Sequence, residues 1–191
     1  MKKIYLIVCI IVALLLSNNT NAQQLKVLSQ SKSSLSLELT IDNYNIKEII
    51  DGDEVFHEIA LSSITIPNDK GKPNLPSVNR FIAVPNNAKA KVVVNNYKKE
   101  ILKDINIAPS RGIVSEYDTT NSDYIKDSDI YSKDELFPAN IVSITEDINL
   151  RGVEAIGLNI SPIQYNPVKK ELIVYTEIEL SIEYEGGDSK F

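Results

Sequence analysis

VEAIGLNISPIQYNPVKKELIVYTEIELSIEY, residues 153–184, is the stretch that decides the fold. Its second half alternates between apolar and polar side chains. Every second position from 172 to 184 forms one set, which consists of Leu172, Val174, Thr176, Ile178, Leu180, Ile182 and Tyr184. Because successive side chains on a strand point to opposite faces, this predicts a long strand with one buried face. Residues 153–160 predict another strand, and residues 165–170, with Asn166 before Pro167, have the composition of a turn. We therefore expect a β-hairpin that closes an antiparallel sheet.

Similar segments recur towards the N-terminus. Residues 33–41 alternate strictly, and shorter strands are expected over 44–50, 55–66, 80–84, 89–97 and 141–144. Lys98-Lys99-Glu100 is expected to break the strand before it, with 101–107 pairing back. Asp51-Gly52-Asp53-Glu54 predicts a turn, and 67–76, with three prolines and a glycine, predicts a loop. Strands separated by closely spaced turns predict an all-β fold, an antiparallel β-sandwich or jelly roll in a single domain.

The N-terminus has the pattern of a signal peptide. Met1-Lys2-Lys3 is basic, residues 4–16 are apolar, and Thr20 and Ala22 are small residues at the −3 and −1 positions. We predict cleavage after Ala22, which divides the chain into a signal peptide, 1–22, and an exported domain, 23–191. A retained membrane anchor is the alternative, but the apolar run is short for a transmembrane helix. The expected location is secreted, periplasmic or on the cell surface of a bacterium.

Composition limits the possible partners and chemistry. Removing Lys2 and Lys3 leaves 18 basic against 26 acidic residues and changes the formal charge from −6 to −8. This charge argues against nucleic acid or an anionic membrane as a partner. The only cysteine, Cys9, would leave with the signal peptide, so no disulfide is expected in the mature chain.

No catalytic set is evident, and we expect neither an enzyme nor a cofactor. His57 is the only histidine and lies in an apolar strand pattern, which favours a structural role. One histidine and no mature cysteine argue against a zinc site. Calcium at Asp51-Gly52-Asp53-Glu54, or at the acidic residues between Asp118 and Glu135, stays an alternative to a plain turn and to solvated charge.

Residues 108–138, here called the excursion, differ in character from the rest. Neither a period of 2 nor one of 3.6 is sustained, although one helical turn is expected near residues 133–136. Seven carboxylates lie along the excursion: Glu116, Asp118, Asp123, Asp127, Asp129, Asp134 and Glu135. Irregular segments of this length in a compact domain are usually functional or disordered.

Three motifs follow one another along the chain. The first is Gly71-Lys72-Pro73-Asn74-Leu75-Pro76 followed by Phe81-Ile82-Ala83-Val84-Pro85. The second is Ile107-Ala108-Pro109-Ser110-Arg111-Gly112. The third is Arg151-Gly152, then Pro162-Ile163-Gln164-Tyr165-Asn166-Pro167, then the strand ending at Tyr184. In this order the three motifs resemble the N-terminal propeptides of gingipain-type cysteine peptidases, and the resemblance extends over roughly residues 35–184.

This resemblance implies an all-β propeptide that chaperones a cysteine peptidase and blocks its active-site cleft until it is cleaved. In the family, a basic side chain on a surface loop enters the specificity pocket, where an acidic group receives it. The physical basis is a charge-assisted, often bidentate contact in a desolvated pocket. The candidates on the excursion are Arg111, Lys126 and Lys133. The gingipain-like peptidase domain is the expected partner, either in cis within a longer precursor or in trans.

A second hypothesis is an exported β-sandwich that binds glycan or protein at the cell surface. Such a module needs exposed aromatic side chains. Tyr117, Tyr124 and Tyr131 recur on the excursion at seven-residue spacing, while the chain has no tryptophan.

Overall fold

The computed structural model describes residues 24–61, 66–112, 124–145 and 147–188. The predicted signal peptide lies outside the described residues. What is described is almost entirely antiparallel β-structure, which confirms the predicted all-β class. The elements are β1 (Gln24–Gln30), β2 (Ser34–Thr40), β3 (Tyr44–Asp51), β4 (Glu54–Leu61), β5 (Val78–Ala83), β6 (Ala88–Leu102), α2 (Ser128–Tyr131), β7 (Val142–Ile144), β8 (Ile148–Leu150), β9 (Val153–Ile160), β10 (Ile163–Asn166) and β11 (Glu171–Gly186).

The first sheet is built around β11. Along one edge, β6 pairs with it from Leu172↔Leu102 to Gly186↔Ala88. Because β6 occupies that edge throughout, the other edge is shared by β10, opposite the first residues of β11, and β2, opposite its middle. β1 continues the sheet beyond β2. The predicted alternation is confirmed, since Ile178, Leu180 and Ile182 are fully buried.

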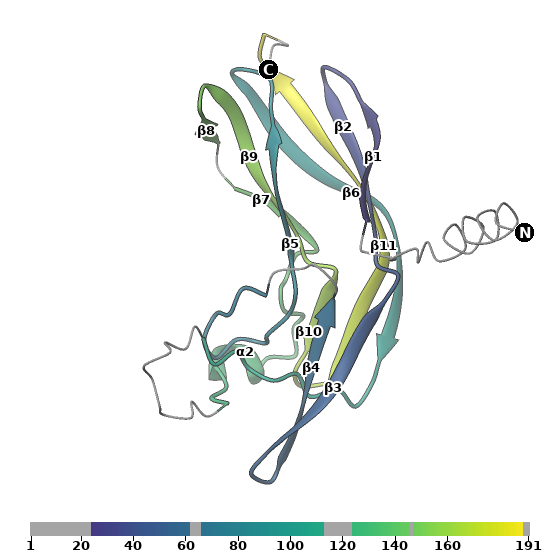
Figure 1. Cartoon of the computed structure of the whole chain (residues 1–191), viewed down its shortest axis with the longest axis vertical. Coiled ribbons are helices and arrows are strands. Elements are labelled where there is room, and N and C mark those ends of the chain that lie inside the picture. Colours follow the sequence, from purple (N-terminus) through teal and green to yellow (C-terminus); the bar gives the residue numbers. More distant parts are fainter. Residues whose placement is uncertain (1–23, 62–65, 113–123, 146, 189–191) are drawn as a thin grey trace, which may run out of the picture.

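The second sheet consists of β5, β9, β7 and β8, with β9 paired to the other three. Its buried residues Ile156, Leu158 and Ile160 belong to the same hydrophobic cluster as Leu37 of β2 and Leu180 of β11. The two sheets therefore pack face to face as a β-sandwich, which fills the upper half of Figure 1.

The β3–β4 hairpin extends from the lower end of the molecule (Figure 1). Its register ends at Asp51↔Glu54, so Gly52 and Asp53 form the turn, and Gly52 has a φ of 59°. The turn predicted at residues 51–54 is thus confirmed. The far edge of β4 is bridged by the chain just before the excursion: the amide of His57 donates to Asn106 O at 2.7 Å, and the amide of Ala108 donates to His57 O at 3.0 Å.

The hairpin predicted between residues 153–160 and 172–184 is wrong. β9 lies in the second sheet, and the hairpin partner of β11 is the four-residue β10, paired from Ile163↔Val174 to Asn166↔Glu171. Pro162, which cannot donate a backbone hydrogen bond, stands where the chain passes from one layer to the other. Both β9 and β11 have buried apolar side chains, so their alternation does not distinguish pairing edge to edge from packing face to face.

Three further expectations are corrected. β6 is not broken at Lys98-Lys99-Glu100 but continues to Leu102, because it is an edge strand on which charged side chains reach solvent. Residues 101–107 do not pair back on it; Ile107 bridges His57 of β4 instead. The helical turn is at Ser128–Tyr131 rather than 133–136, with Asp127 as its N-cap. Among the described residues, no helix has the length and hydropathy to span a membrane.

Truncating the centre of β11 is expected to be costly. Leu180 is 0% exposed, so Leu180→Ala should lower the free energy of unfolding by about 2–5 kcal/mol through lost transfer energy and a cavity. Urea denaturation measures this difference. Glu183→Gln, at an exposed position of the same strand, is the control and should change it by about 0.5 kcal/mol or less. Equal loss in both variants would contradict the assignment of faces.

Candidate functional site

Gly71 holds the two described halves of the excursion together. Its amide donates to Ser110 O at 2.8 Å, and its carbonyl accepts from the amide of Asp127 at 2.9 Å. Its φ of 82° lies in the left-handed region, where a side chain is disfavoured, and an added Cβ would touch Asp127 at 3.4 Å. The glycine of the first motif is therefore required by backbone geometry. Residues 113–123, between the two halves, lie outside the described residues.

Arg111 is exposed and rests on an aromatic ring. Its guanidinium carbon lies 4.8 Å from the ring centroid of Tyr124. Tyr124 is in turn fixed by β4, because its ring lies 5.2 Å from that of Phe56 and its hydroxyl donates to Glu58 Oε1 at 3.3 Å. Burial, followed by the negative charge of Glu58, raises the pKa of Tyr124. Arg111 is thus displayed on a ring that β4 supports.

Lys126 is held from several sides. Its Nζ forms an ion pair with Glu54 Oε1 and lies 4.9 Å from the Phe56 ring centroid and 5.6 Å from that of Tyr131. The Lys126 hydrogen bond lowers the pKa of the Glu54 carboxyl, and the Asn106 side chain, which donates to the same oxygen at 3.0 Å, lowers it further. Only 32% of the Lys126 side chain is exposed.

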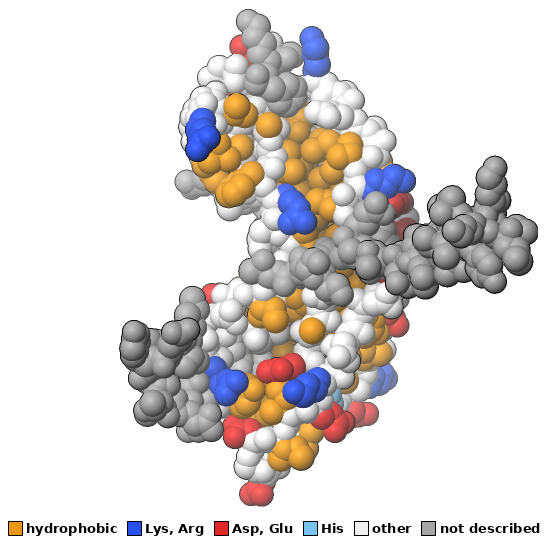
Figure 2. Space-filling view, in the orientation of Figure 1, with side chains coloured by type: hydrophobic (Ala, Val, Ile, Leu, Met, Phe, Trp, Pro, Cys, Tyr) orange, Lys and Arg blue, Asp and Glu red, His pale blue; other side chains and the backbone are white. Residues whose placement is uncertain are grey.

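Lys133 differs from both. It follows α2 and is exposed, and its recorded contact in the described part of the chain is a backbone hydrogen bond from its amide to Ile130 O at 3.2 Å. The three sequence candidates therefore stand in three environments: Arg111 stacked on a ring, Lys126 enclosed, and Lys133 in solvent. Figure 2 shows basic and acidic side chains next to one another around a hydrophobic patch in the lower half of the molecule.

Two of the described acidic residues of the excursion, Asp127 and Asp134, have partners in the fold. The carboxylate of Asp127 caps α2, and Asp134 accepts from Asn166 at 2.7 Å and pairs with Lys169 at 3.0 Å. Hydrogen bonds from Asn166 and Lys169 lower the pKa of Asp134. Asp118 and Asp123 lie outside the described residues. Calcium binding by the excursion stays a prediction.

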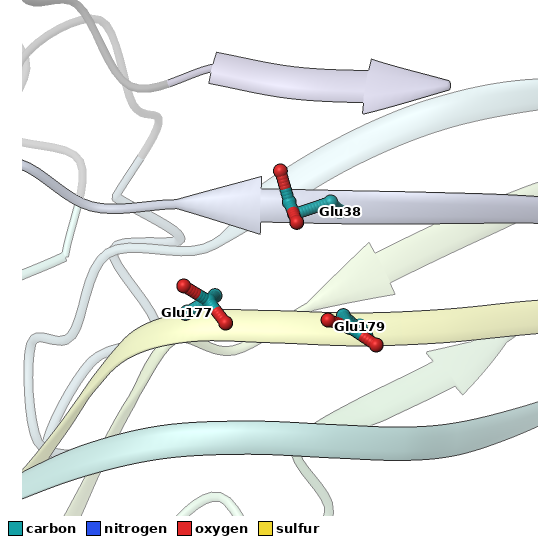
Figure 3. Close-up of side chains that lie close together, drawn as sticks. All are labelled: Glu38, Glu177 and Glu179. Atoms are coloured by element: carbon teal, nitrogen blue, oxygen red, sulfur yellow. The ribbon is translucent and has the colours of Figure 1, made fainter. Parts of the chain in front are cut away.

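Three carboxylates outside the excursion come close enough to share a cation: Glu38 of β2 with Glu177 and Glu179 of β11 (Figure 3). Lys98 of β6 lies 2.8 Å from Glu177, and the nearby carboxylates, Glu177 foremost, raise the pKa of Lys98. Lys26 of β1 stands opposite Glu38 in the sheet. The three glutamates therefore belong to a row of opposite charges across adjacent strands, which explains why they lie close together.

His57 and Tyr131 have structural contacts. The Nδ1 of His57 accepts from the amide of Asn106 at 3.1 Å, which fits the expected strand histidine. The hydroxyl of Tyr131 donates to Ile107 O at 3.0 Å, and burial raises its pKa. Since Tyr124 also packs on Phe56, neither described tyrosine of the seven-residue series is an open platform for a sugar. Tyr117 lies outside the described residues.

A pocket of about 370 Å³ borders the first motif. Its walls come from residues 67–77 and 137–140, and Asn159 and Ser161 contribute from the second sheet. The charged residues of its lining, Asp69 and Lys72, pair with each other at 3.1 Å. None of the three candidate basic residues lines it, so the pocket is separate from the surface that carries them.

Phe56 and Glu54 were missed as site residues by the sequence analysis. Phe56 reads as an ordinary strand residue and Glu54 as the end of a turn. Nothing in the sequence connects them with residues 124–126, about 70 positions later, because that connection is made only by the docking of the excursion on β4.

The chain is similar in sequence to known proteins. The family model Propeptide_C25 matches residues 17–190. Gingipain R2 from Porphyromonas gingivalis is 30% identical over 159 residues, which are 83% of this chain and 22% of that protein. Lys-gingipain from the same organism is 24% identical over 98% of this chain and 12% of its own length. The chain thus spans about a fifth or less of the length of these relatives.

Solved structures agree with the fold. The chain resembles one from a complex of Porphyromonas gingivalis RgpB pro- and mature domains, with a TM-score of 0.79, 30% identity and coverage of 86% of both chains. A structure concerned with the zymogenic latency of gingipain K gives a TM-score of 0.71 at 18% identity, covering 89% of this chain and 97% of that one. The latter supports the fold alone.

The ion pair at Lys126 leads to a pH prediction. Since the pKa of Glu54 is lowered in the folded protein, the pair stabilises the fold above the ordinary value of 4.5, and this contribution is lost as the pH falls through the folded pKa. Lys126→Met should raise the Glu54 pKa towards 4.5 and remove that dependence. An NMR titration of the side-chain carboxyls measures the Glu54 pKa in each protein, and the pH dependence of folding stability follows from the difference. The Asp134 carboxyl is the internal control. An unchanged Glu54 pKa in the variant would contradict the pair.

Proposed function

The chain belongs to the Propeptide_C25 family, the propeptides of gingipain-type cysteine peptidases, and on this premise we propose that it chaperones and inhibits a gingipain-like peptidase domain through Arg111. Its role is that of a propeptide rather than a catalytic domain. The peptidase domain is the partner, in cis or in trans. The pattern of residues 1–22 supports export, so that residues 23–191 act in the periplasm, at the cell surface or outside the cell.

Exposure and weak attachment are the observation that favours Arg111 over Lys126, and its place in the second family motif favours it over the equally exposed Lys133. A cation–π contact at an exposed site is worth about 0.5–1 kcal/mol, whereas a bidentate guanidinium–carboxylate contact in a desolvated pocket belongs to the strongest polar contacts. Arg111 therefore gains binding free energy when its guanidinium leaves the Tyr124 ring and enters an acidic pocket. Lys126 would instead have to leave Glu54 and two rings.

The sequence of the neighbouring segment supports the same choice. Residues 113–123 contain no lysine or arginine but do contain Glu116, Asp118 and Asp123. A basic anchor must then come from the residues at the borders of this segment or beyond them. Arg111 stands two positions before it, within the second family motif.

The proposed chaperone role rests on the propeptide's own hydrophobic core. A propeptide that folds by itself offers its partner a preformed template, and the buried core shared by both sheets supports such independent folding. Refolding of the denatured peptidase domain with and without residues 23–191 tests this role, which predicts a higher yield of active enzyme with the propeptide present.

Removing the anchor should weaken inhibition strongly. Purified residues 23–191 should inhibit a gingipain-like peptidase of the same organism stoichiometrically at nanomolar concentration. Arg111→Ala should raise the inhibition constant by about 30-fold or more, the loss typical of a binding hot spot. Lys133→Ala is the matched control and should have little effect. If the wild-type chain inhibits and the triple variant with alanine at 111, 126 and 133 inhibits equally well, the basic-anchor mechanism is wrong.

A further inference from the structure

Phe56 is buried away from the main core. It is 2% exposed, yet the continuous hydrophobic cluster between the two sheets does not include it. Its recorded ring contacts are with Tyr124, centroid to centroid at 5.2 Å, and with the Nζ of Lys126 at 4.9 Å. Phe56 therefore forms a small satellite cluster with the excursion.

Lys126 connects this cluster to three parts of the chain. Its ammonium group contacts Glu54 and Phe56 of β4 and the ring of Tyr131 in α2. Glu54 is held from a further segment by the side chain of Asn106, at 3.0 Å. The two rings cover the cation, and the carboxylate neutralises it.

We propose that Lys126 is a positioning residue, which fastens residues 124–127 of the excursion to β4 and so fixes the ring on which Arg111 is displayed. Tyr124 lies two positions before Lys126, and Asp127, directly after it, donates to Gly71 O. If Lys126 left Glu54 and the two rings, Phe56 would become more exposed and Tyr124 would be held less firmly against β4. We call the contacts of Lys126 with Glu54, Phe56 and Tyr131 the clamp. The clamp is a property of the free chain, and only its purpose, to position Arg111 for inhibition, rests on the proposed function.

The alternative role for Lys126 is that of the inserting residue, and the two roles predict opposite effects at Glu54. A positioning lysine needs Glu54, so loss of that carboxylate weakens inhibition. An inserting lysine is restrained by Glu54, so loss of the carboxylate leaves inhibition unchanged or improves it. Glu54 therefore distinguishes the two roles through a change that leaves the lysine intact.

The experiment uses residues 23–191 carrying Lys126→Met, Lys126→Arg, Glu54→Gln, or both Lys126→Met and Glu54→Gln. Lys133→Met is the matched control, because it removes the same charge from an exposed site. Hydrogen exchange of the Asp127 and Tyr131 amides, both hydrogen-bonded in the fold, reports on the clamp in the free chain. The inhibition constant against the peptidase reports on its consequence.

Lys126→Met and Glu54→Gln should each speed exchange of these amides by about tenfold, a change that corresponds to losing the ring and ion-pair contacts together. Each should also weaken inhibition, and the double variant should add little to either single one. Lys126→Arg should restore both readouts, because guanidinium also pairs with carboxylate and stacks on rings. Lys133→Met should change neither.

Two results would overturn the proposal: unchanged exchange in both single variants, or full inhibition by Glu54→Gln together with its loss in Lys126→Met. If Lys126→Met fails to fold, the Glu54→Gln and Lys126→Arg variants still decide between the two roles. If the wild-type chain does not inhibit, the proposed function fails, while the exchange rates still test the clamp.

Discussion

Both edges of β11 are hydrogen-bonded, and this double pairing determines where the other elements lie. β6 follows one edge over nearly the whole strand, while β10 and β2 divide the other. A shift of β11 by one residue would turn Ile178, Leu180 and Ile182 to the solvent side, so the register is strongly specified by burial. The second sheet packs on the face that this register fixes, and the β3–β4 hairpin and the excursion lie at the lower end of the same framework (Figure 1).

Backbone groups of the first motif join the two described halves of the excursion. The first motif offers the amide and carbonyl of Gly71 to the two halves of the excursion, and the amide of Ser110 donates to Lys72 O at 2.8 Å. Since backbone groups do not depend on side-chain identity, this part of the attachment constrains the conformation of the chain at residues 71, 110 and 127 rather than the side chains there. A glycine at a φ of 82° and the prolines around it are the residues that this arrangement demands.

Strand positions were largely predictable because burial on one face leaves an alternating pattern, as in Ser34–Thr40. Pairing was less predictable. β9 and β11 show the same pattern, yet they lie in different layers, and the charged triplet within β6 resembles a strand end although it stands on an exposed edge. Alternation reports which face is buried, not which neighbour buries it.

At the candidate site, the sequence likewise shows which residues are charged but not what surrounds each of them in the fold. The family resemblance pointed to the basic residues of the excursion, Arg111, Lys126 and Lys133, and the fold gives each of them different surroundings. Lys126 is enclosed because Phe56 and Glu54, on a strand about 70 residues earlier, happen to lie beneath it. A cation that is already neutralised and covered gains little by entering an acidic pocket, since it must first give up equivalent contacts. A cation resting on one exposed ring gives up little. By this criterion Arg111 and the exposed Lys133 are freer to insert than Lys126, and Arg111 is the proposed anchor because it also lies in the second family motif.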